Sequence, residues 1–129
     1  MMNLINKKQT LYGLDEYDKV IDTVVSDLKA EKYYFDIKLI LTEALTNAFE
    51  HGNDGDKNKP IDLVYNFDGK YLNFKVISSN TKPESISIPK SIDEDSLLDE
   101  HGRGLFLIQS MADKVEFKDN SLIITKCIL

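Results

Sequence analysis

The chain of 129 residues contains no tryptophan, a single cysteine and no long uninterrupted hydrophobic run. Cys127 has no partner for a disulfide within the chain, which suits a reducing compartment. No apolar stretch approaches the roughly 20 residues that cross a bilayer. Residues 1–9 also lack the apolar run of a signal peptide. These absences predict a cytoplasmic protein without a membrane-spanning segment.

Basic residues are also in short supply. The chain has 16 Lys and Arg against 22 Asp and Glu, a net charge of −6, and the basic residues gather in no cluster. Because proteins that bind nucleic acids neutralise phosphates with basic side chains, we expect no direct binding to nucleic acid. A hydrophobic content of 42% is sufficient for one core in a chain of this length. We therefore expect residues 1–129 to form a single domain.

The first half of the sequence predicts two helices. Residues 14–28 repeat apolar positions at helical spacing, with acidic residues where the helix begins. A more apolar helix is predicted from residue 34 to residue 50 or 51. Gly52 and Gly55 are expected to end that helix through a left-handed cap.

The rest of the chain is dominated by the period of two that is typical of strands. Strands are predicted in five segments: 1–13, 61–67, 72–76, 115–117 and 122–127. Asp68 and Gly69 form the turn of one hairpin, and a short helix is expected over residues 105–113. The polar segment of about residues 79–101 is predicted to be a functional lid.

This order of elements predicts an α+β fold with two layers. We expect a mixed, mostly antiparallel sheet that about three helices cover on one face. The other face of the sheet remains available to solvent or to a partner.

One helix carries an unusual polar stripe. Glu43, Asn47 and His51 recur at i, i+4 and i+8, which places them on one side of the helix. Ala44 and Ala48 beside them are expected to leave room for a ligand. A carboxylate can polarise a hydroxyl, and an amide oxygen suits Mg²⁺. The alternative is a helix with polar residues at its solvent edge, where His51 interacts with the helix dipole.

A second candidate segment, Gly102-Arg103-Gly104, opens the predicted helix 105–113. Free backbone N–H groups at the start of a helix attract phosphate, and glycine allows close approach. Arg103 is expected either near that phosphate or paired with a lid carboxylate such as Asp99 or Glu100. A zinc site is improbable because its candidate ligands lack the usual paired spacings; these are His51, His101, Glu43 and Glu50.

These two segments resemble motifs of the GHKL ATPases, which have the Bergerat or histidine kinase-like ATPase fold. Glu43-x-x-x-Asn47 followed by His51-Gly52 resembles the N-box of that superfamily. The run from His101 to Ile108, followed by Met111-Ala112-Asp113, resembles the second glycine box and the helix after it. Within the superfamily the chain most resembles the anti-sigma factor serine kinases, and the order of elements agrees over nearly the whole chain.

The resemblance implies an ATP-binding regulator with Mg²⁺ as its metal. Glu43 would be the general base, and Asn47 would hold Mg²⁺ through the nucleotide. The implied nucleotide-binding residues are Asn47, His51, Ser78, Gly102, Arg103, Gly104, Leu105 and Phe106. The attacking hydroxyl in such proteins belongs to a serine of an anti-anti-sigma partner, and the unmodified domain sequesters a sigma factor. The leading strand and helix tend to form a dimer interface, which implies a homodimer.

The first glycine box of the family, Asp-x-Gly-x-Gly, has no counterpart here. After Val76 the chain continues through residues 77–83 without Asp or Gly, and Ser78 stands where the aspartate is expected. A neutral hydroxyl binds an adenine amine less strongly than a carboxylate does, by roughly 1–3 kcal/mol. The alternative function is therefore a protein-interaction module of the same fold that is not catalytic and binds nucleotide weakly or not at all.

Overall fold

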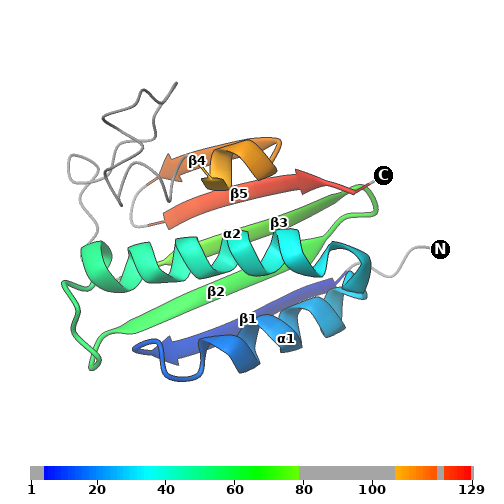
Figure 1. Ribbon diagram of the computed structural model, residues 1–129. Helices are drawn as coiled ribbons and strands as arrows, with labels where there is room; N and C mark the ends of the chain where they lie inside the picture. Colours follow the sequence, from blue (N-terminus) through cyan, green and yellow to red (C-terminus); the bar gives the residue numbers. More distant parts are fainter. Residues whose placement is uncertain (1–4, 79–106, 119–120, 129) are drawn as a thin grey trace.

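The computed structural model describes residues 5–78, 107–118 and 121–128 (Figure 1). Five strands form one sheet in the order β1-β2-β3-β5-β4, and every pair of neighbours is antiparallel. The strands are β1 (Ile5–Tyr12), β2 (Pro60–Phe67), β3 (Tyr71–Ile77), β4 (Lys114–Lys118) and β5 (Ser121–Cys127). All five lie in segments where the alternating pattern predicts strands. The mixed pairing in that prediction is not seen among the described strands.

The helices lie together on one face of this sheet (Figure 1). Helix α1 (Tyr17–Leu28) is followed by a single 3-10 turn, η1 (Glu31–Tyr33), and by α2 (Tyr34–Asn47). A π-helical turn, η2 (Ala48–Gly52), continues α2, and residues 107–111 form a further short helix. The predicted two-layer α+β sandwich is confirmed. Among the described residues, no helix is both long and apolar enough to cross a membrane.

The alternation of the strands determines which side chains face the helices. Residues paired across the sheet share a face, so Leu11, Ile61, Val76 and Leu122 all lie toward the helical layer. Both helices contribute the other half of the core, as their apolar spacing predicts. The helix residues buried there are Ile21, Val24, Val25, Leu28, Ile37, Ile40, Leu41, Ala44, Leu45 and Ala48.

The helical segment ends at the two glycines that the sequence suggests. Gly52 is the last residue of the π turn, and the left-handed backbone follows at Asp54 with φ 53° and Gly55 with φ 72°. Asn53, directly after the π turn, is fully buried, and its Nδ2 donates to the carbonyl of Lys59 at 3.1 Å. The loop is therefore closed by a side chain that binds its far end.

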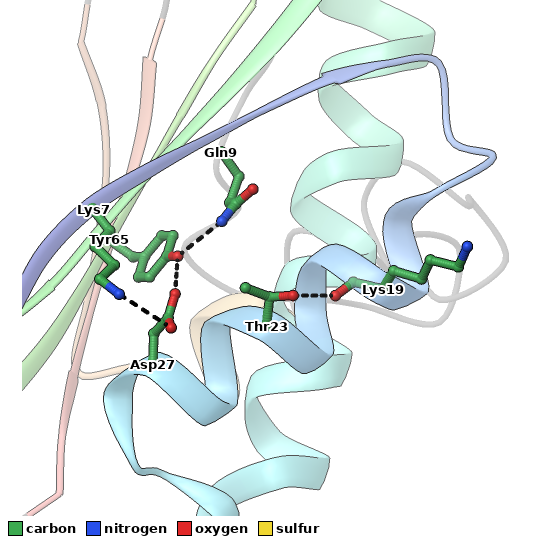
Figure 2. Close-up of polar contacts among 6 residues, drawn as sticks. All are labelled: Lys7, Gln9, Lys19, Thr23, Asp27 and Tyr65. Carbon is green, nitrogen blue, oxygen red and sulfur yellow. Dashed lines mark hydrogen bonds and ion pairs between the residues drawn. The ribbon is translucent and has the colours of Figure 1, made fainter.

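A polar network connects α1 to the sheet (Figure 2). The Tyr65 hydroxyl on β2 donates to Asp27 Oδ2 at 2.6 Å and accepts from Gln9 Nε2 at 3.3 Å. Lys7 Nζ lies 3.3 Å from Asp27 Oδ1. Asp27 is in the last turn of α1, where the helix dipole disfavours a negative charge. The phenol and the ammonium compensate that charge and hold the helix over β1 and β2.

The network shifts the pKa values of both main partners. The hydrogen bond from Tyr65, aided by Lys7, lowers the pKa of Asp27 despite partial desolvation. Burial, together with the bond to Asp27, raises the pKa of Tyr65. A lowered carboxyl pKa stabilises the fold above its unfolded value of about 3.9, and that stabilisation disappears as the pH falls through the folded value. The raised pKa of Tyr65 stabilises the fold below about pH 10 and is lost as the pH rises through the folded value.

We predict that Tyr65→Phe lowers the free energy of unfolding at pH 7 by about 1–3 kcal/mol, because Asp27 loses its strongest donor. The deficit should shrink as the pH falls below about 4, because the Asp27 carboxyl is protonated there in the unfolded chain, and in the folded protein at a still lower pH. Urea unfolding at pH 7 and at about pH 3 measures both values. Tyr12→Phe is the matched control, because Tyr12 is 62% exposed and should unfold like the parent. A Tyr65→Phe protein as stable as the parent at pH 7 would contradict this role of the network.

Candidate functional site

Helix α2 presents two of the predicted site residues one turn apart. Glu43 and Asn47 are both partly buried and lie four residues apart in regular α-helix, so they share a side as the spacing predicts. The neighbouring alanines do not leave room for a ligand. Ala44 is 1% exposed and Ala48 is 9% exposed, and both belong to the hydrophobic core. Glu43 and Asn47 therefore stand at the boundary between that core and the surface of the helix.

Asn47 carries the most informative atom of the site. Its Oδ1 is buried and, among the described residues, has no hydrogen-bond partner. Leaving such an acceptor unpaired costs about 1–3 kcal/mol, so buried polar atoms are almost always satisfied. An amide oxygen is a hard ligand of the kind that Mg²⁺ or its bound water requires. This atom therefore fits a cation site, as the sequence predicts for Asn47.

The helix changes its geometry immediately after Asn47. Residues Ala48–Gly52 form a π-helical turn, and the N–H of Asn53 donates to the carbonyl of Ala48 at 2.9 Å. His51 lies in this turn and is partly buried, so the period of 3.6 that relates it to Glu43 does not extend to its position. Single π turns often occur at functional sites. Asn47 occupies the junction between the two helical geometries.

The fold brings Ser78 to the same end of the molecule as Asn47. Ser78 follows Ile77, which pairs with Asp62 near the start of β2. The start of β2 is bound in turn by Asn53, directly after the π turn of α2, through a hydrogen bond of 3.2 Å to the carbonyl of Pro60. Ser78 is 5% exposed, and the alternation along β3 places it toward the helices. The two predicted halves of the site therefore lie at one end of the sheet.

The remaining predicted residues lie outside the described part of the chain. These are Gly102, Arg103, Gly104, Leu105 and Phe106, together with His101 and the lid of about residues 79–101. The described chain resumes at the helix of residues 107–111, where Ile108 is fully buried in the core. Among the described residues, no three His, Cys, Asp or Glu side chains are grouped to hold a metal ion.

Sequence reasoning missed two residues that organise this region. Asn53 is buried and closes the loop after the π turn. In the sequence, an asparagine next to Gly52 is typical of an ordinary turn. Lys126 is the other, because it occupies a position of β5 where the alternation of Leu122 and Ile124 predicts an apolar side chain. That break in the alternation was the available signal.

Comparison with known proteins agrees with this architecture. No curated protein compared with the chain gives a significant match. A family model described as the histidine kinase-like ATPase domain matches residues 17–126. The match begins with α1 and extends into β5, so it includes α2, Ser78 and the helix of residues 107–111. Since it spans most of the 129 residues, the chain belongs to the histidine kinase-like ATPase domain family.

Proposed function

We propose that this chain binds Mg-ATP at the end of the sheet where α2 and β3 meet. The observation that carries the proposal is the buried, unpaired Oδ1 of Asn47, which a metal ion or its water would satisfy. Asn47 would hold the cation, Ser78 would accept a hydrogen bond from the adenine amine, and His51 would lie nearby. By resemblance, the segment from Gly102 to Phe106 would hold the phosphates with Arg103 close to them.

We further propose that the chain is a protein-serine kinase. Bound Mg-ATP supplies the phosphoryl group for the reaction. Glu43 lies one turn before Asn47 on the same side of α2, so a hydroxyl placed beside the nucleotide would be within its reach. Its carboxylate would take the proton from the attacking serine hydroxyl. The partly buried position of Glu43 favours a fixed orientation of the carboxylate.

The partners that best fit this proposal are those of the anti-sigma factor serine kinases. The chain would phosphorylate a serine of a small anti-anti-sigma protein and, before that, sequester a sigma factor in the cytoplasm. The resemblance of the two motifs and the order of the elements support this assignment. The same resemblance suggests a homodimer through β1 and α1.

We predict that Asn47→Leu abolishes Mg-ATP binding without lowering the stability of the nucleotide-free protein. The substitution keeps the approximate shape of the side chain and removes the unpaired oxygen, so stability should stay equal or rise by up to about 1–3 kcal/mol. Calorimetric titration with Mg-ATP measures binding, and urea unfolding measures stability. Thr46→Val, on the same helix turn, is the matched control and should bind Mg-ATP like the parent. A parent protein that gives no heat at millimolar Mg-ATP would overturn the proposed binding.

We predict that Glu43→Ala retains Mg-ATP binding within about threefold but slows phosphoryl transfer by about 10²–10⁴-fold, the usual contribution of a general base. Transfer is measured with radiolabelled ATP and a candidate anti-anti-sigma protein. The acceptor with its serine replaced by alanine serves as the control for the site of modification. A Glu43→Ala protein that labels the acceptor as fast as the parent would remove Glu43 from the mechanism.

One observation favours a second candidate function. The segment after β3 lacks the aspartate and glycines of the first glycine box, and the buried Ser78 occupies the aspartate position. A neutral hydroxyl supplies a weaker contact to adenine than a carboxylate does. The fold would then serve as a non-catalytic protein-interaction module that binds nucleotide weakly or not at all.

We predict that Ser78→Asp raises the affinity for Mg-ATP by about tenfold, because a charge-assisted bond replaces a neutral one. The affinity for Mg-GTP should not rise, since guanine presents an oxygen where adenine presents the amine. Calorimetric titration of both nucleotides into the parent and the variant gives the four values. Equal gains for the two nucleotides, or none for either, would show that the adenine does not bind at Ser78.

A further inference from the structure

Lys126 is a charged residue in a position built for an apolar one. It pairs with Leu72 across β3 and β5, which places its side chain on the face that the helices cover. Only 12% of this side chain is exposed. Lysine is rarely buried to this extent unless its charge is paired, so its contacts determine what it does.

The ammonium group of Lys126 connects two helix ends. Its Nζ donates to the carbonyl oxygen of Met111 at 2.9 Å and lies 3.4 Å from Asp36 Oδ2. Met111 is the last residue of the helix 107–111, where free carbonyls and the dipole favour a cation. Asp36 lies in the first turn of α2, where the dipole favours an anion. One cation therefore satisfies the end of one helix and the start of another.

The end of β5 makes further contacts with residues that flank these two helices. Asp113, two residues after the short helix, donates its N–H to Thr125 at 2.8 Å, and its carboxylate accepts the N–H of Cys127. On the side of α2, the hydroxyl of Tyr33 donates to the carbonyl of Ile128 at 3.0 Å. Lys126 lies between these two sets of contacts, and its own two contacts reach both helices.

We propose that Lys126 is a positioning residue for the nucleotide site. The inference rests on the proposed function. Lys126 connects the short helix, which follows residues 102–106 in the sequence, to α2, which carries Glu43 and Asn47. Lys126 contacts neither group of site residues. It sets the placement of the short helix relative to α2.

The geometry distinguishes this role from that of an ordinary surface ion pair. Lys114 and Glu116 on β4 are 2.7 Å apart but 65% and 46% exposed, so solvent screens their attraction. The Lys126 side chain is largely removed from water, and its Nζ also donates to the backbone carbonyl of Met111 at the end of the short helix. Its loss would leave the end of the short helix and Asp36 without their shared cation.

The test compares Lys126→Met, which keeps an unbranched stem and removes the charge, with Lys126→Arg, which restores a donor and a cation. Lys114→Met on the same hairpin is the matched control. The first readout needs no nucleotide: hydrogen exchange of the Ala112 and Asp113 amides, relative to amides of β2 and β3. These two amides donate to Ile108 and Thr125 and report whether the end of the short helix stays in place. The second readout is the Kd for Mg-ATP by calorimetry.

We expect Lys126→Met to speed exchange at Ala112 and Asp113 by about tenfold or more while β2 and β3 change little, and to raise the Kd for Mg-ATP by about tenfold. Lys126→Arg should recover most of both values, and Lys114→Met should match the parent. Unchanged exchange in Lys126→Met would overturn the connection between the helices. Faster exchange with an unchanged Kd would overturn the positioning role. A parent that does not bind Mg-ATP would refute the proposed function and with it the positioning role, while exchange would still decide whether Lys126 connects the helices.

Discussion

The one-sided burial of the sheet beneath α2 is the constraint on which the rest of the structure depends. Ile37, Ile40, Leu41, Ala44 and Leu45 are almost completely buried against the strands, so the rotation of α2 about its axis is fixed. With that rotation fixed, Glu43 and Asn47 must lie where the packed side of the helix meets its exposed side. The candidate site is thus placed by hydrophobic packing, and its polar atoms need no contact with one another to be held in position.

Two buried polar groups, the Tyr65 hydroxyl and Asn47 Oδ1, differ in whether the described residues supply a hydrogen-bond partner. The Tyr65 hydroxyl is satisfied by Asp27 and Gln9, and both bonds end within the protein, so the network stabilises α1 on the sheet. Asn47 Oδ1 is equally removed from water but has no partner among the described residues. Because burial without a partner is unfavourable, Asn47 Oδ1 requires a partner that the described residues do not supply, and under the proposed function that partner is the cation or its water.

The sequence predicted the parts of the fold that depend on local periodicity. The strands of the two hairpins and the apolar sides of α1 and α2 follow from spacing alone, and so does the shared side of Glu43 and Asn47. The Asp68-Gly69 turn follows from its residue types. The π turn could not be predicted, because the apolar spacing of α2 does not distinguish it from regular α-helix. The bonds of Asn53 to carbonyls six and seven residues later also lie outside that spacing. The bond between Asp27 and Tyr65 joins residues 38 positions apart, beyond the reach of any local pattern. The prediction that Ala44 and Ala48 leave room for a ligand was wrong for the same reason, since only the packing against the sheet shows that they are core residues.

The residues proposed to hold the cation and the adenine are neutral, whereas the residues that connect the short helix to α2 are charged. Asn47 and Ser78 are neutral, whereas Lys126 and Asp36 are charged and lie toward the start of α2, away from Asn47 at its other end. A charge placed next to the nucleotide would alter its affinity directly, through Coulomb interactions that fall off with distance and with solvent screening. A charge at the far end of α2 has little direct effect of that kind and acts through the geometry of the helices. This separation allows the placement of the short helix to be adjusted by Lys126 while the polar groups at the site stay the same. Under the proposed function, the specificity of the site and the placement of the short helix relative to α2 are therefore properties of different residues.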